Sequence, residues 1–408
     1  MKRWMACLIS LLLVFTTAGH AENTQEALLG MPAERLNAFN EAWFFGDAHE
    51  YQHDLCIATL QLAQDAFRGS DDAPDEAIRL FFDNRGFSDP QIDDYAIKTA
   101  DTIGSAISHR TIENDDSSST LIAVAVCGGN YSMEWLSNFD VGTEALHKGF
   151  SESARKVVQR IEEYIAFHQI ENPRFWITGY SRAAAVSNLT AAFLSQQGIA
   201  GDSQIFCYTF ATPRTVIDKN AHLQHRNIFN IINQADLVPH VPLAAWGYTW
   251  YGSTIYLPTS QNQSLNYDRL LPAFNEACRL LSCPLPAQDG DKSFADKAEL
   301  CAKGLAMSVT TPQLYADFYQ PIIGKLITGE EMLLSEQLLI SMMLMKAFNY
   351  VLKDDGVSIT LSNISDIADV LPAMVPLLPM LLQHMPQIYA AWLLSMDGDA
   401  FLRSSMHP

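Results

Sequence analysis

The feature that most constrains the fold of this chain is a serine placed between two contrasting runs. Residues 175–181 read Phe-Trp-Ile-Thr-Gly-Tyr-Ser, and residues 182–194 are Ala-rich and free of Gly and Pro. The first run is typical of a buried parallel strand and the second of a helix. A sharp turn between them would project the Ser181 Oγ away from its neighbours, as in serine nucleophiles. The alternative is an ordinary strand–helix junction with an incidental serine.

The residues around Ser181 favour the catalytic interpretation. Small residues at Gly179 and Ala183 would let the strand and helix pass close together. The helix N-terminus would offer main-chain N–H groups and a positive dipole end to an oxyanion. The N–H of Arg182 is therefore the first candidate oxyanion donor. The second would come from Gly129, after the apolar run 120–127, although a flexible Gly-Gly turn is the simpler alternative.

Strand-like and helix-like runs alternate between residues 120 and 233, which predicts an α/β fold with a largely parallel sheet. Gly129, Ser181 and Asp236 each follow a predicted strand, and sites in such sheets gather at the carboxyl ends of strands. Residues 22–110 are predicted to be mainly helical, with a short strand at 106–112 and a break at Asp89-Pro90. The predicted strands are 120–127, 175–180, 204–211 and 226–233, and the predicted helices are 143–168 and 182–197.

A serine nucleophile needs a base and a carboxylate that orients the base. Asp236, in the loop after the 226–233 strand, is the candidate carboxylate, although a turn-forming Asp is the alternative. The histidines that follow it are His240, His384 and His407. His240 shares the loop of Asp236 and His407 is next to the last residue, so elimination favours His384. A structural histidine in apolar surroundings is the alternative.

The N-terminus predicts export. Lys2 and Arg3 precede an uncharged apolar run at 4–17, and small residues stand at 19 and 21. This pattern is typical of a cleavable signal peptide, 1–21, so the mature chain would begin near Glu22 in the periplasm or outside the cell.

The charge and the apolar C-terminal run exclude some partners. The net charge is −20, or −22 without Lys2 and Arg3, which argues against nucleic acid and anionic membrane surfaces as electrostatic partners. The uncharged run 370–396 is long enough to cross a membrane, but prolines interrupt it, and buried or cap helices are favoured over a transmembrane segment in the mature chain. These prolines are Pro372, Pro376, Pro379 and Pro386.

Of the seven cysteines, six would remain after export. Cys127 is predicted to be unpaired, because it lies in a strand-like run. At least one disulfide is expected among Cys278, Cys283 and Cys301. The sequence contains no Cys-x-x-Cys pair and no His-Glu-x-x-His, so no metal site and no cofactor are predicted.

The composition changes after about Pro258. Residues 22–258 are predicted to form the α/β core. Residues 259–370 are helical, apolar and cysteine-bearing, and we interpret them as an inserted cap. Residues 371–408 form a C-terminal segment that carries His384.

The motifs occur in an order that resembles the class 3 (fungal-lipase-like) α/β-hydrolases, and more closely their bacterial members with an inserted cap. The resemblance covers roughly residues 45–258 and a short piece around 384. The similar segments are the oxyanion loop 127–136, the elbow 177–185, the Phe-Gly-x-Pro-Arg-like strand 208–214, the acid loop 233–243, the aromatic–glycine run 246–252 and the His-x-x-x-x-Tyr at 384–389.

The resemblance implies an α/β-hydrolase fold and the triad Ser181, Asp236 and His384, with Gly129 and Arg182 as oxyanion donors. Ala183 replaces the usual second glycine of the elbow, and Cys127 replaces the common arginine. Gly129 replaces a hydroxyl residue, so the oxyanion hole would rely on main-chain N–H groups.

The implied function is that of a secreted, cofactor-free serine hydrolase. It would cleave carboxylic esters of lipids through an acyl-enzyme, as a triacylglycerol lipase does, with transient contact to a lipid interface. A phospholipase A or a short-chain carboxylesterase would use the same machinery. A catalytically inactive protein that binds lipid or a partner through its apolar cap is the alternative of another class.

Overall fold

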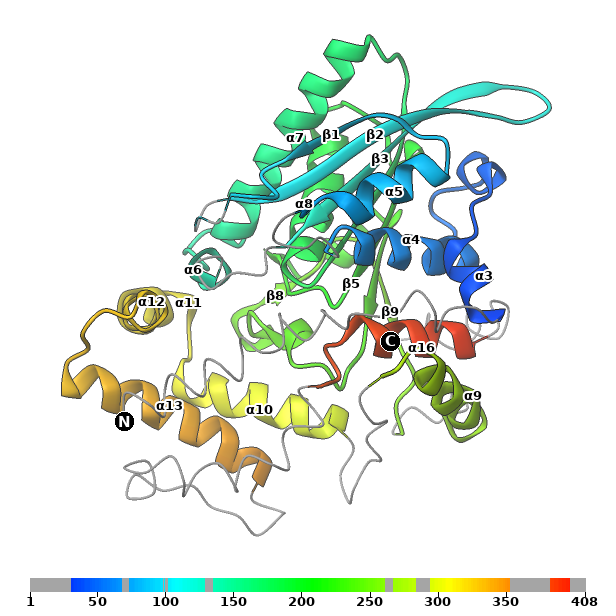
Figure 1. Ribbon diagram of the computed structural model, residues 1–408. Helices are drawn as coiled ribbons and strands as arrows, with labels where there is room; N and C mark the ends of the chain where they lie inside the picture. The colour runs from blue at the N-terminus through cyan, green and yellow to red at the C-terminus, as the bar shows by residue number, and fades with distance from the viewer. Residues whose placement is uncertain are drawn as a thin grey trace.

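The fold is built on a seven-stranded sheet, which Figure 1 shows with helices on both of its faces. The structure, a computed structural model, describes residues 31–67, 73–97, 99, 102–128, 135–260, 267–283, 294–352 and 382–396. The strand order is β1-β2-β3-β4-β5-β7-β9. The strands are β1 (Ser88–Asp93), β2 (Gly104–Glu113), β3 (Ser118–Cys127), β4 (Arg174–Tyr180), β5 (Ile205–Phe210), β7 (Ile228–Ile232) and β9 (Ser253–Tyr256).

The sheet is largely parallel, which confirms the predicted α/β class. Strands β3, β4, β5, β7 and β9 pair in parallel, whereas β2 runs antiparallel to both β1 and β3. The inner strands β4, β5 and β7 and most of β3 are buried, as expected for a sheet covered on both faces, whereas the edge strand β9 is largely half-buried. Strand β9 had no clear sequence signal, because it has only four residues and follows a glycine-rich turn.

Alternate strand residues serve two separate layers of the core. Trp176 of β4 faces a layer that includes the helices α4 and α16, whereas its neighbour Ile177 faces the layer of α7 and α8. The first layer also contains α5 and α9. The bounds are α4 (His53–Asp65), α5 (Glu76–Asn84), α7 (Lys148–His168), α8 (Arg182–Gln196), α9 (Tyr267–Leu280) and α16 (Pro386–Ser395).

The expected break at Asp89-Pro90 is in fact part of the edge strand β1. The register of β1 against β2 shifts between Ser88 and Gln91, so Asp89 and Pro90 form a bulge. Proline cannot donate to a strand ladder and is accommodated at an edge or a bulge. The first part of the chain is therefore less helical than expected, although α3 (Met31–Asn37) and the 3-10 turn η1 (Glu41–Phe45) precede α4.

The helices between 294 and 352 pack around a third apolar cluster, which includes Ala298, Ile340 and Ala347 and which Val141, Ala235 and Tyr248 from the sheet end join. Figure 1 shows these yellow-to-orange helices beyond one end of the sheet. By contrast, α9 packs against α16, where the Phe274 and Trp392 rings stack at 3.9 Å. The helices of the cluster are α10 (Phe294–Ser308), α11 (Pro312–Leu314), the π-helical turn η8 (Tyr315–Tyr319), α12 (Gln320–Thr328) and α13 (Leu334–Leu352).

Among the residues that the structure describes, no helix is long and apolar enough to span a bilayer.

Short elements complete the described part of the chain. The remaining elements are α6 (Trp135–Asn138), the ribbon of β6 (Val216–Ile217) and β8 (Tyr248–Thr249), and the 3-10 turns η3 (Asp202–Gln204), η4 (Ala221–Leu223), η5 (Val238–His240) and η6 (Ala244–Trp246).

The expected disulfide is not formed in the structure, where the six cysteines of the described residues are all reduced. Cys301 lies in the α10 cluster, whereas Cys278 and Cys283 lie together at the end of α9. The hydrogen bond that the Cys283 thiol donates to the Cys278 sulfur, together with burial, raises the pKa of the Cys283 thiol far above its usual value. Oxidation begins from a thiolate, so the protonated Cys283 thiol does not begin this reaction at neutral pH.

We therefore expect six titratable thiols in the denatured, unreduced chain that lacks residues 1–21. Counting thiols with an aromatic disulfide reagent in denaturant measures this. A count of four, together with a linked peptide containing Cys278 and Cys283, would contradict the structure and restore the expectation from sequence.

Candidate active site

Ser181 occupies a strained turn between β4 and α8. Its φ and ψ are 57° and −126°, a backbone conformation that is uncommon for residues other than glycine. Its N–H donates to the Phe210 carbonyl at 2.9 Å, which ties the turn to the end of β5. A Cβ at Gly179 would lie 2.3 Å from the Ala183 carbonyl oxygen, so only glycine fits there. The sequence thus holds Ser181 at the end of the sheet, half-buried.

Asp236 lies in the turn that follows β7 and is fully buried. Its N–H closes the turn by donating to the Asn233 carbonyl at 3.0 Å. Its Oδ1 accepts from the Val238 N–H at 2.9 Å, and its Oδ2 accepts from His384 Nδ1 at 2.7 Å. The carboxylate is therefore hydrogen-bonded at both oxygens, which compensates for its burial.

His384 precedes α16 and links the other two residues. Its Nε2 lies 2.9 Å from the Ser181 Oγ, and its main-chain carbonyl accepts from the Tyr180 hydroxyl at 2.7 Å. Since a carboxylate only accepts, Nδ1 must carry the proton toward Asp236, and Nε2 is left with the lone pair toward Ser181. The structure therefore brings the three sequence-predicted residues into one hydrogen-bonded chain, in the geometry of a nucleophile, base and orienting acid.

Packing of α16 against the first core layer holds His384 in place. The His53 ring of α4 donates from Nε2 to the Leu393 carbonyl at 2.9 Å. The Asn233 side chain of the acid turn bonds Gln383, immediately before His384, at 3.1 Å. The loop that carries the base is thus fixed to the loop that carries the carboxylate.

Tyr389 is a site residue to which sequence reasoning assigned no role. Its hydroxyl donates to the Asp236 Oδ2 at 2.8 Å and lies 3.3 Å from the Asn233 N–H. Burial, with the charge of Asp236 adding to it, raises the pKa of Tyr389 well above its usual value. The hydroxyl therefore stays protonated and remains a donor. The available signal was its position in the His-x-x-x-x-Tyr pattern at 384–389.

Replacing Tyr389 with Phe removes a hydrogen bond to a charged group, worth roughly 1.5–3 kcal/mol. If Asp236 orients the base, we expect ester turnover to fall about tenfold through kcat with KM nearly unchanged, since a tenfold change corresponds to about 1.4 kcal/mol. Tyr180→Phe is the matched control. This variant loses a hydrogen bond to a neutral carbonyl, so its kcat should decrease less than that of Tyr389→Phe. An unchanged kcat in Tyr389→Phe would show that the Tyr389 hydroxyl does not help to position Asp236 for catalysis.

The oxyanion donors are only partly described. The Arg182 N–H is the first of α8, where main-chain donors have no partner one turn earlier. The Arg182 side chain points elsewhere, since its guanidinium donates to the Thr102 carbonyl and the Ser137 hydroxyl at 3.1 and 2.9 Å. Gly129 lies outside the described residues and stays a prediction.

Of the other two candidate bases, the structure describes only His240, which is not in the chain of hydrogen bonds. The His240 Nε2 lies 3.0 Å from the Gln234 carbonyl, to which it donates, and burial lowers the pKa of His240. His407 lies outside the residues that the structure describes.

A cavity of about 190 Å³ opens beside Ser181 and is walled by apolar side chains from the sheet end and from the 294–352 helices. Asn138, Ser181 and Arg182 are the polar residues among those that line it. An extended apolar group could therefore lie within reach of the Ser181 Oγ. The apolar walls include Phe139, Phe150, Val238, Leu243, Leu305 and Met343.

In a comparison with known protein families, residues 120–246 match the family described as Lipase (class 3), a family of carboxylic ester hydrolases. "Secreted mono- and diacylglycerol lipase 1" of Fusarium solani is 26% identical over 168 residues, which are 38% of this chain and 49% of that protein. The chain thus spans about half the length of this curated relative.

Fungal lipases are also found among similar solved structures. A Rhizomucor miehei triacylglyceride lipase is 23% identical, with a TM-score of 0.30, over 41% of this chain and 67% of that one. A lipase from Rhizopus microsporus var. chinensis is 19% identical, with a TM-score of 0.32, over 44% of this chain and 64% of that one.

Proposed function

We propose that this chain, whose residues 120–246 match the class 3 lipases, is a serine hydrolase that cleaves carboxylic esters of lipids. The observation that carries the proposal is the buried chain of hydrogen bonds from Asp236 through His384 to Ser181, with an apolar cavity at its end. Loss of ester turnover in Ser181→Ala, argued in the Discussion, is the test.

The geometry supplies each step of a two-stage hydrolysis. The Ser181 Oγ attacks the acyl carbonyl while His384 Nε2 takes its proton, and Asp236 stabilises the resulting imidazolium. The carbonyl oxygen becomes an oxyanion facing the Arg182 N–H at the positive end of α8. His384 then gives the proton to the leaving alcohol. The alcohol departs, and the acyl group remains bound to the Ser181 Oγ. Water, deprotonated by His384, releases the carboxylic acid and restores the serine.

The lipid part of the proposal has two supports besides the relative's description. The cavity beside Ser181 is apolar, and the surface of α13 exposes apolar side chains to solvent. Leu334, Leu338 and Met342 are 66%, 39% and 45% exposed. Methionine and leucine suit a surface that must fit varied acyl chains. We propose that the 294–352 helices act as a cap over Ser181 that contacts the lipid interface.

We also propose export through the predicted signal peptide. Residues 1–21 lie outside the described residues, so the support comes from their composition and from the secreted relative. Release of a chain that begins near Glu22 would agree with this proposal.

If the cap contacts lipid, turnover of long-chain esters should rise when the substrate passes its aggregation concentration, because lids open at interfaces. Leu338→Ser together with Met342→Ser should reduce this rise and favour soluble short esters. Initial rates across the aggregation point measure both effects.

Leu80 and Leu223 are also exposed, at 48% and 64%, and their double Ser variant is the matched control, because they lie outside the 294–352 helices. It should behave as wild type. A preference for monomeric acetate or butyrate esters without any rise would instead favour a short-chain carboxylesterase.

A further inference from the structure

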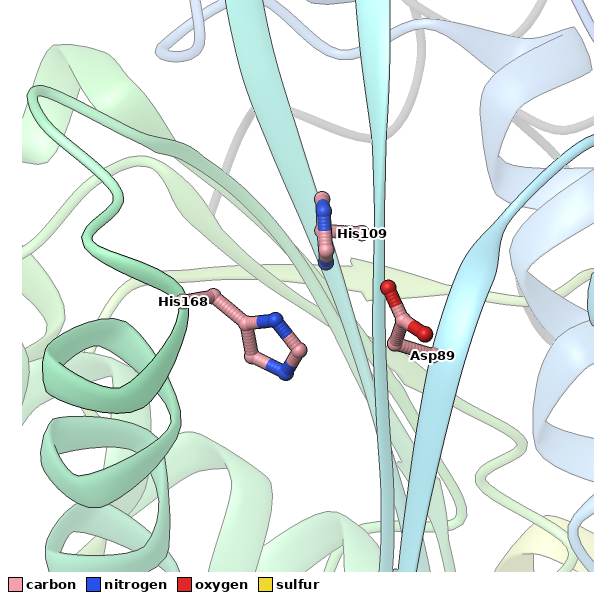
Figure 2. A group of neighbouring side chains, drawn as sticks. All are labelled: Asp89, His109 and His168. Carbon is pink, nitrogen blue, oxygen red and sulfur yellow. The ribbon is translucent and has the colours of Figure 1, made fainter.

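A second group of chemically capable side chains lies far from Ser181, at the edge of the sheet. Asp89 of β1, His109 of β2 and His168 at the end of α7 each offer one ligand atom, and these atoms all lie within 4.8 Å of one another. Figure 2 shows the three side chains turned toward a common space from three different elements. The hydrogen-bonded chain at Ser181 does not include them.

The backbone positions these side chains in two ways. The bulge in β1 places Asp89 in the left-handed region, with φ of 51°, and bulges re-aim side chains in this manner. His168 is the last residue of α7, where the negative end of the helix dipole favours a cation. An anionic ligand and a helix C-terminus therefore face the same space.

Tyr164 fixes the ring of His109. Its hydroxyl donates to the Asp89 main-chain carbonyl at 3.0 Å and lies 2.8 Å from His109 Nδ1. With the single O–H proton donated to that carbonyl, the hydroxyl oxygen accepts from Nδ1. The lone pair of the neutral ring is then on Nε2, the state in which histidine binds metal ions.

We propose that Asp89, His109 and His168 form a Zn²⁺ site. Two imidazoles and a carboxylate match the ligands that zinc takes in proteins, with water in a fourth position. Donor atoms around a tetrahedral zinc lie about 3.3–3.5 Å apart. The three ligand atoms lie within 4.8 Å of one another, so metal binding would draw them closer through rotation of the exposed Asp89 and half-buried His168 side chains.

The site has a structural role, because it is remote from the chemistry. Phe150 lines the cavity beside Ser181, and His168 lies eighteen residues further along the same helix, a distance of about 27 Å at 1.5 Å per residue. Zinc would join β1, the outermost strand, to β2 and to the end of α7. We therefore expect it to stabilise the fold without changing ester hydrolysis.

The test titrates ZnCl₂ into the metal-stripped chain without residues 1–21 and without a polyhistidine tag, followed by calorimetry and thermal unfolding. We expect one Zn²⁺ per chain at micromolar concentration and a rise in Tm that a chelator reverses, since a ligand bound only to the folded state stabilises it. Asp89→Asn, which keeps a residue that tolerates the left-handed backbone, and His168→Gln should each weaken binding about tenfold or more.

His49→Gln is the matched control, because it removes a histidine from the exposed Asp47–His49 pair and should bind zinc as wild type does. Ester turnover should be equal with and without bound zinc. The proposal is overturned if the wild type neither binds zinc nor gains Tm, or if Asp89→Asn and His168→Gln bind as tightly as wild type. Turnover that depends on the single bound zinc would refute the structural role.

Discussion

Ser181→Ala is expected to lower ester turnover by roughly four to six orders of magnitude, as removal of a nucleophile does in serine hydrolases. The reason is that the substitution removes the one atom, Oγ, that both receives the acyl group and bonds to His384 Nε2. The fold should survive, because the Ser181 N–H bond to Phe210 and the start of α8 involve main-chain atoms only. Turnover of a p-nitrophenyl ester and lipid panel, with circular dichroism as the check on folding, measures the effect.

A folded Ser181→Ala that keeps most of its turnover would exclude Ser181 as the nucleophile. A wild type that turns over none of the esters, while binding lipid vesicles, would instead favour the inactive lipid-binding protein.

Ester turnover should decrease nearly as much in His384→Ala as in Ser181→Ala, because the acceptor of the serine proton is lost together with the link to Asp236. His240→Ala is the matched control from the acid loop. Its Nε2 is occupied by the Gln234 carbonyl, so a mild effect is expected. His407→Ala should also be mild. Steady-state kinetics on one soluble ester compares the three variants.

An active His384→Ala together with an inactive His240→Ala would identify His240 as the base and refute the assignment of His384. Because His384 also packs against Tyr180, each variant needs an unfolding curve to show that the loss is chemical.

The sheet and the setting of Ser181 could be predicted because their signals are local. The apolar runs of β3, β4 and β5 are short and continuous, and each is ended by a change in composition. The close approach at Gly179 also has a local signature, since glycine and alanine flank the serine on both sides.

The features that depend on distant contacts could not be predicted in this way. His384 was reached by elimination, and 148 positions separate it from Asp236 in sequence. Its position depends on α16 packing against α9 and α4, which no periodicity reveals. The role of Tyr389 on Asp236 depends on the same packing.

Three other features that the sequence did not predict have the same physical origin. Asp89-Pro90 was expected to interrupt the chain's regular structure. Pairing of β1 with β2 instead accommodates these two residues as a bulge within the strand. The group of Asp89, His109 and His168 has no motif spacing, because each residue comes from a different element. Cysteine proximity in sequence likewise did not place Cys301 beside Cys278.

Labelling with a fluorophosphonate, followed by peptide mapping, tests the central claim most directly. The probe reacts with a serine only where a base activates it and the oxyanion is stabilised. We expect one label per folded chain, on the peptide that contains Ser181, with labelling lost in Ser181→Ala and strongly slowed in His384→Ala. An unlabelled folded wild type, or a label that persists in Ser181→Ala, would contradict the account.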